Sequence, residues 1–210
     1  MATVIDSGGI SESAARAPSG RIQRHAGIDR LFHWLTAASV LTLLATGLLP
    51  VLGVKFNWVD IHWIVGCVLI VLIAFHIVRS LIWQRFRTIW FSGAEIARKQ
   101  VGKYTVAQKL MHLAMTLMIL GAVITGGTML AKMDTPLWKR DPYVFTQEAW
   151  GTIYFIHGLA ALSAVTLVMI HIYFSLLPEN RMYLRAMIKG WITRQELVRH
   201  HEAHTKKSSG

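Results

Sequence analysis

The sequence predicts an all-α protein whose core is a four-helix transmembrane bundle, followed by an amphipathic C-terminal cytoplasmic helix. Of its 210 residues, 53% are hydrophobic and only 16% are charged, whereas soluble domains contain about 25% charged residues. Four stretches carry no Lys, Arg, Asp or Glu and are long enough, at about 20 residues, for a helix to cross a bilayer. Histidines recur inside these stretches at a spacing of 14 residues. The composition therefore predicts a membrane protein.

The predicted spans are residues 31–53, 61–78, 110–131 and 149–178. They belong to one predicted domain, residues 21–199, which includes the amphipathic helix. Arg181, Arg185 and Lys189 recur every fourth residue in that helix, between apolar side chains. Residues 1–20 are rich in Ser, Ala and Gly and predict a disordered cytoplasmic tail, and residues 200–210 predict a flexible tail.

The distribution of basic residues predicts the orientation of the spans. The N-terminal segment, the second loop and the C-terminal segment contain 4, 7 and 7 Lys and Arg residues, whereas the first and third loops contain 1 and 3. Because cytoplasmic segments carry the excess of Lys and Arg, both termini are expected in the cytoplasm. The net charge of +11 thus reflects the flanks of the spans and does not indicate nucleic-acid binding. A single cysteine, Cys67, excludes an intrachain disulfide and a cysteine-ligated iron–sulfur cluster.

The fourth span contains two histidines, His157 and His171, 14 positions apart. Fourteen helical residues return to within roughly 40° of the same face, about 21 Å further along the axis. One membrane histidine can simply hydrogen-bond a neighbouring helix, but two on one face fit the axial ligands of two haem groups at different depths. His62 lies at the same predicted depth as His157. His171 has two candidate partners on the cytoplasmic side, His33 and His76, and spacing leaves both open.

Four motifs carry a family resemblance, namely IDRLFHW at 28–34, GKYTVAQK at 102–109, YFIHG at 154–158 and IHIYF at 170–174. With them, residues 21–201 resemble the cytochrome b (gamma) subunit of membrane-bound respiratory formate dehydrogenases, within the four-helix di-haem cytochrome b superfamily. The resemblance implies two haem b groups. It implies His33 and His171 as ligands of the cytoplasmic haem iron, and His62 and His157 as ligands of the periplasmic one.

The resemblance also implies a quinone site beside the cytoplasmic haem. The positions that match it are Tyr104, Thr105, Ala107 and Gln108. Thr105 stands where the family often has Asn, which leaves open how a ubiquinone or menaquinone would bind. His112 lies close to this site and is expected to be either a ligand or a polar neighbour of the haem or quinone.

The implied function is electron transfer in the bacterial inner membrane. An iron–sulfur beta subunit on the periplasmic side would deliver electrons through the two haems to quinone. A molybdenum- or tungsten-containing catalytic alpha subunit would hold the formate site, so this chain would carry only the quinone-reducing site. The alternatives are the cytochrome b subunit of a hydrogenase, a stand-alone di-haem cytochrome b that oxidises superoxide or a soluble donor, and a histidine-lined metal transporter.

Overall fold

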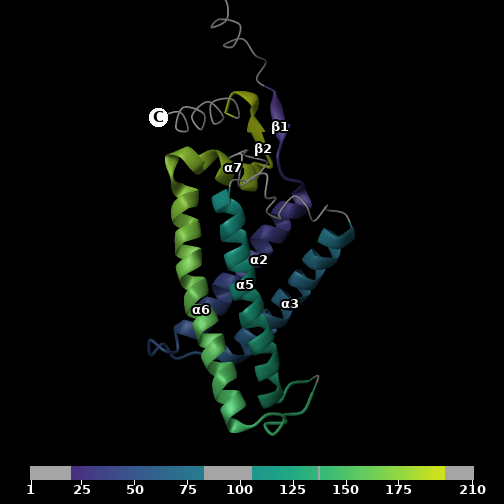
Figure 1. Ribbon diagram of the computed structural model, residues 1–210, viewed down its shortest axis with the longest axis vertical. Coiled ribbons are helices and arrows are strands. Elements are labelled where there is room, and N and C mark those ends of the chain that lie inside the picture. The colour runs from purple at the N-terminus through teal and green to yellow at the C-terminus, as the bar shows by residue number, and fades with distance from the viewer. Residues whose placement is uncertain (1–19, 83–105, 137, 197–210) are drawn as a thin grey trace, which may run out of the picture. The chain divides into compact units, whose positions relative to one another are not determined.

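A computed structural model describes residues 20–82, 106–136 and 138–196 of the chain (Figure 1). The chain forms two compact units. Residues 32–173 make up the helical unit, and the two ends of the chain, residues 1–31 and 174–210, make up the terminal unit. The predicted tails, residues 1–20 and 200–210, lie almost entirely outside the described residues.

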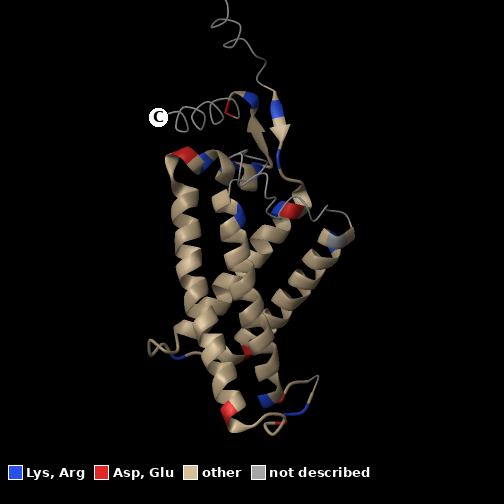
Figure 2. Cartoon of the chain, in the orientation of Figure 1, with Lys and Arg blue, Asp and Glu red and all other residues tan. Residues whose placement is uncertain are grey.

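Among the described residues, four helices are long and apolar enough to cross a membrane, which confirms the predicted all-α fold with four spans. They are α2 (Gly27–Leu48), α3 (Trp58–Ile82), α5 (Val106–Met129) and α6 (Gln147–Leu176). The shortest has 22 residues, which is about 33 Å of helix and enough for a hydrocarbon core about 30 Å thick. A short 3₁₀ helix, η2 (Leu130–Lys132), extends the end of α5. Figure 2 shows charged residues at the ends of these helices rather than along their length.

The first span begins and ends earlier in the chain than predicted. The sequence is free of charge as far as Gly53, but α2 ends at Leu48. Pro50 accepts a hydrogen bond from the Gly53 amide (3.0 Å), and Gly53 has φ +87°, a conformation that only glycine adopts without strain. A turn therefore closes the helix at this point, although the apolar composition continues beyond it.

The helical unit buries few of its own side chains. In the most apolar part of each span, only 6–17% of the residues are buried within the chain. The buried positions on these helices include several small residues, namely Ser39, Thr46, Thr125, Ala160 and Ala164. The remaining apolar surface needs an apolar environment outside the chain, which a bilayer supplies.

The terminal unit contains a small sheet that the sequence analysis did not predict. Strand β1 (Arg21–Gln23) pairs antiparallel with β2 (Trp191–Thr193), and Ile22 lies opposite Ile192. The short helix α7 (Arg181–Lys189) precedes β2 and follows the 3₁₀ turn η3 (Pro178–Asn180). The C-terminal helix expected from the sequence is thus only nine residues long. It ends at Gly190, which has φ +87° and donates its N–H to the Ala186 carbonyl (2.8 Å).

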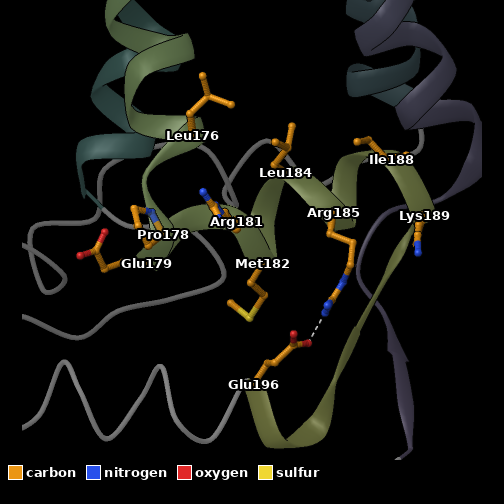
Figure 3. A pocket seen from close by; sticks show the side chains of 10 residues that line it. All are labelled: Leu176, Pro178, Glu179, Arg181, Met182, Leu184, Arg185, Ile188, Lys189 and Glu196. Carbon is orange, nitrogen blue, oxygen red and sulfur yellow. Dashed lines mark hydrogen bonds and ion pairs between the residues drawn. The ribbon is translucent and has the colours of Figure 1, made fainter.

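Contacts between the two chain ends hold the terminal unit together. The Gly190 carbonyl accepts hydrogen bonds from the backbone amides of Arg24 (2.9 Å) and His25 (3.2 Å). Arg30 donates to the Ile188 carbonyl (2.6 Å). Figure 3 shows the hollow beside α7, where Arg185 reaches across to Glu196 in an ion pair. The chain entering the first span is thereby tied to the chain leaving the last one.

Candidate functional site

The helical unit brings four histidines together as two pairs. The ring centroids of His33 and His171 are 6.3 Å apart with an interplanar angle of 57°. The ring centroids of His62 and His157 are also 6.3 Å apart, with an angle of 72°. The sequence leaves the partner of His171 open, and the structure places His33 beside it.

Helix α6 contributes one imidazole to each pair, and two other helices supply the partners. His157 lies in the first half of α6 and His171 near its end, 14 residues and so about 21 Å apart along the helix. His33 lies in the second turn of α2, and His62 lies in the second turn of α3. Because α2 and α3 follow each other across a single turn, these two histidines fall at opposite ends of the unit. The two pairs therefore lie at two separate depths.

The separation of the rings matches what two imidazoles on opposite sides of one metal ion require. A bound imidazole nitrogen lies about 2.0–2.1 Å from its metal in zinc sites and about 1.2 Å from its own ring centre, so two imidazoles on one ion would have centroids at most roughly 6.4–6.6 Å apart. Both pairs, at 6.3 Å, lie just inside this limit. Within the described ranges, no three His, Cys, Asp or Glu side chains gather into a metal site. The pairs are therefore suited to a metal that brings its remaining ligands with it, as haem iron does.

Hydrogen bonds determine which nitrogen of His157 carries the proton. Its Nδ1 lies 3.1 Å from the Ala122 carbonyl and 2.9 Å from the Thr125 hydroxyl oxygen. A carbonyl oxygen can only accept, so Nδ1 must be the donor. The Thr125 hydroxyl donates its own hydrogen to the Gly121 carbonyl (2.6 Å) and accepts from Nδ1. Nε2 is then left with a lone pair, which is what a metal ligand needs.

His62 has the same arrangement on the other side of its pair. Its Nδ1 lies 2.8 Å from the hydroxyl oxygen of Thr46 on α2. That hydroxyl also lies 2.8 Å from the Thr42 carbonyl in its own helix, and when its hydrogen goes to this carbonyl its oxygen accepts a hydrogen bond from Nδ1–H of His62. Nε2 of His62 is again left as the nitrogen with a lone pair.

A glycine lies against each of these two rings. A Cβ atom at Gly126 would lie 3.0 Å from Cε1 of His157, closer than an ordinary contact, and one at Gly47 would lie 3.6 Å from Cε1 of His62. Each glycine directly follows the threonine that bonds the same ring. The backbone of α5 can therefore approach His157 only because position 126 has no side chain.

The other two membrane histidines have different surroundings. The His76 ring stacks on Phe32, with centroids 4.6 Å apart and an interplanar angle of 13°. His112 is exposed, and its Nδ1 lies 3.5 Å from the Thr116 hydroxyl in the same helix. His76 therefore stacks on the residue next to His33 and does not replace His33 in the pair with His171.

The predicted quinone site is only partly described. Ala107 and Gln108 lie in the first turn of α5, where Ala107 is exposed and Gln108 is half-buried. Tyr104 and Thr105 lie outside the described residues. His112 follows Gln108 by one turn of the same helix. The site thus remains a prediction from the sequence.

The sequence analysis missed the two threonines that bond the imidazoles. A signal for them exists, because a Thr-Gly dipeptide occurs in both helices that supply these bonds. Gly47 follows His33 by 14 residues and Gly126 follows His112 by 14 residues. His62 and His76 have the same spacing, as do His157 and His171. The helix pairs α2–α3 and α5–α6 thus share one pattern.

Comparison with known proteins agrees with the motifs. A family model described as prokaryotic cytochrome b561 matches residues 24–190. The cytochrome b556(fdo) subunit of formate dehydrogenase from Escherichia coli K12 is 23% identical over 202 residues, which cover 86% of this chain and 90% of the relative. Proteins of the same name from Escherichia coli O6:H1 and O157:H7 match to the same extent. The resemblance predicted from the motifs is thereby confirmed.

Proposed function

Since the chain belongs to the prokaryotic cytochrome b561 family, it is a multi-pass membrane protein that transfers electrons with haem b, and we propose that it binds two haems as a respiratory electron-transfer subunit. Its partners in this proposal are those of a formate dehydrogenase, the complex named for its Escherichia coli relatives. Electrons would enter from a periplasmic iron–sulfur subunit and leave to quinone.

The observation that carries the proposal is the repeated 6.3 Å separation of paired imidazoles at two depths of α6. We assign His62 and His157 to the periplasmic haem, and His33 and His171 to the cytoplasmic haem. Bound haem b supplies a one-electron carrier at each of the two positions. The chain holds each group through a pair of helices, and its charge-free spans keep the path between the two positions in an apolar environment.

The sides of the membrane follow from the Lys and Arg distribution, which supports cytoplasmic termini in a bacterial inner membrane. His62 and His157 then lie on the periplasmic side, where the iron–sulfur beta subunit would bind. A molybdenum- or tungsten-containing alpha subunit would carry out the formate chemistry. About 21 Å of α6 would separate the haem that receives electrons from the haem that passes them to quinone. Electron transfer from the periplasmic to the cytoplasmic side would therefore contribute to the membrane potential.

Quinone reduction is assigned to the cytoplasmic end of α5. We place the quinone against Tyr104, Thr105, Ala107 and Gln108. The Gln108 amide offers both a donor and an acceptor to a quinone oxygen. Its position in the first turn of a span puts it at the membrane surface, where protons from the cytoplasm can reach the site.

The test is a haem count with spectra. The purified chain should contain two low-spin haem b groups, seen as a sharp band in the reduced-minus-oxidised spectrum. His157→Ala should remove the periplasmic haem, and His171→Ala the cytoplasmic one, leaving one haem per chain in each variant. If both variants kept two haems, the ligand assignment would be wrong, and a wild-type chain without visible absorption would point to metal transport instead.

The donor is tested separately by purification in mild detergent. Under the proposal the chain travels with a formate-oxidising subunit and an iron–sulfur subunit, and formate reduces its haems. Reduction by hydrogen in such a preparation would assign the chain to a hydrogenase. A chain that purifies alone and is reduced by superoxide or a soluble donor would be a stand-alone cytochrome b.

A further inference from the structure

The hydroxyls of Thr46 and Thr125 occupy equivalent places on the two sides of the His62–His157 pair. Thr46 on α2 bonds His62 on α3 (2.8 Å), and Thr125 on α5 bonds His157 on α6 (2.9 Å). Both threonines are buried, at 5% and 8% exposure. Each is therefore held at the contact between two helices.

The bonding of these threonines differs from that of an ordinary threonine in a helix. A helical threonine usually bonds only the carbonyl four residues back. Thr128, one turn after Thr125 on α5, has this simple arrangement and is half-buried. Thr46 and Thr125 make the same backbone bond, and in addition the hydroxyl oxygen of each is hydrogen-bonded to an imidazole of the neighbouring helix. The backbone bond commits the hydroxyl hydrogen, so the oxygen can face the ring only as an acceptor.

We propose that Thr46 and Thr125 are positioning residues that hold His62 and His157 with Nε2 directed to the haem iron, an inference that rests on the proposed function. The hydroxyl oxygen fixes the Nδ1–H tautomer and the rotation of each ring. The glycine that follows each threonine lets the helix backbone come close enough for the bond to form. Together, the two Thr-Gly dipeptides form a matched support around one haem position.

The bond has a chemical consequence at the iron. A hydrogen bond from Nδ1–H to an acceptor makes the imidazole a more basic ligand, which favours the ferric over the ferrous state. The reduction potential of the periplasmic haem is thereby kept low. A low potential at the point of electron entry favours transfer onward to the second haem. The two hydroxyls therefore act on the direction of electron flow as well as on haem retention.

The experiment is a redox titration of the full chain purified with its partner subunits. Thr46→Val and Thr125→Val keep the size of the side chain and remove the acceptor oxygen. In each variant one of the two haem components should shift to a higher midpoint potential, and the double variant should shift further. Haem transfer to an excess of apomyoglobin should be roughly tenfold faster or more for the same component, the scale seen when such outer ligand contacts are lost.

Matched variants separate this role from general packing. Thr46→Ser and Thr125→Ser retain the hydroxyl and should restore the wild-type potential. Thr128→Val changes a threonine one turn from Thr125 on the same helix. This control should leave the midpoint potentials of both haem components unshifted. Thr46→Ala and Thr125→Ala replace any valine variant that does not accumulate in the cell. They should shift the midpoint potential of the same haem component in the same direction.

The shifted component must be the one that His157→Ala removes. Unshifted potentials in the valine variants, or equal shifts of both components, would overturn the inference alone if His157→Ala still lost one haem. Retention of two haems in His157→Ala would instead overturn the ligand assignment under the proposed function, and this inference with it.

Discussion

Three glycines on two helices lie at different distances from the histidine rings. Substituting each by alanine tests whether the haem sites depend on this close approach of the helix backbone. A Cβ at Gly126 would lie 3.0 Å from Cε1 and 3.6 Å from Nδ1 of His157. A Cβ at Gly47 would lie 3.6 Å from Cε1 of His62, an ordinary contact, and one at Gly127 would meet nothing within 4 Å. Gly126→Ala should therefore disturb a haem, Gly47→Ala should do so much less, and Gly127→Ala should not.

The magnitude follows from what His157 can do when the methyl group is added. The ring would have to move by a few tenths of an ångström to restore a normal contact. It is also held by the Thr125 hydroxyl and the Ala122 carbonyl, so this movement stretches both hydrogen bonds. Overpacking of this kind costs about 1–3 kcal/mol, which would weaken haem binding roughly 5- to 150-fold.

The assay is the haem content per chain, with the spin state read from the oxidised spectrum. Gly126→Ala should lose part of one haem or convert it to high spin, while the second haem keeps its spectrum. Gly127→Ala supplies the control for adding a methyl group to the same helix. A wild-type haem content in Gly126→Ala, or an equal loss in Gly127→Ala, would refute the reasoning from the close contact.

Three further outcomes are expected. His33→Ala should lose the cytoplasmic haem and His76→Ala should keep two low-spin haems, because the structure pairs His33 with His171; the reverse result in haem counts would exchange their roles. Gln108→Leu should leave both haems bound and slow their re-oxidation by quinone roughly tenfold in stopped-flow traces. Gln147→Leu, at the other end of the bundle, should leave the rate of re-oxidation unchanged. Equal re-oxidation rates in wild type and Gln108→Leu would place the quinone elsewhere. Glu196→Gln should lower the thermal midpoint at pH 7 in calorimetry. The difference should shrink as the pH falls through the lowered pKa of Glu196, and it would be constant if the carboxylate charge were irrelevant.

The sign of the pH effect comes from the surroundings of Glu196. Burial by itself would raise its pKa, but hydrogen bonds from the Thr193 amide (2.9 Å) and hydroxyl (2.7 Å) and from Arg185 outweigh burial and lower the pKa. The carboxylate therefore stabilises the folded state fully above its ordinary pKa. That stabilisation is lost as the pH falls through the lowered value. The effect belongs to the terminal unit and not to the haem positions.

The four spans could be predicted because burial in lipid excludes charge over a whole helix, a signal that extends across about 20 residues. The exact end of the first span could not, because the turn at Gly53 lies within the same apolar run. The pairing of β1 with β2 was also missed. Strands of three residues carry no periodic pattern, and residues 21–23 and 191–193 come from opposite ends of the chain. Pairing of this kind depends on contacts between segments that are far apart in the sequence.

For the histidines, the sequence predicts the depth of each ring in its span but not the direction in which the ring points. Helical spacing gives the depth of each imidazole along its span, and on that basis His33 and His76 were equivalent. Which ring faces His171 depends on how α2 and α3 are rotated about their axes, and the sequence does not specify that. Thr46 and Thr125 were missed for a related reason, because a threonine within a span usually satisfies its hydroxyl in its own helix.

The shared pattern of α2–α3 and α5–α6 gives the two ends of the bundle different properties. At one end, each half supplies a histidine and a supporting Thr-Gly dipeptide, so the His62–His157 pair is nearly symmetric. At the other end, His33 pairs with His171, and their counterparts in the pattern are His112 and His76. These counterparts contact a threonine of their own helix and a phenylalanine of α2, respectively. One repeated pattern thus places a pair of histidines at each of two depths, while His112 and His76 stay outside both pairs.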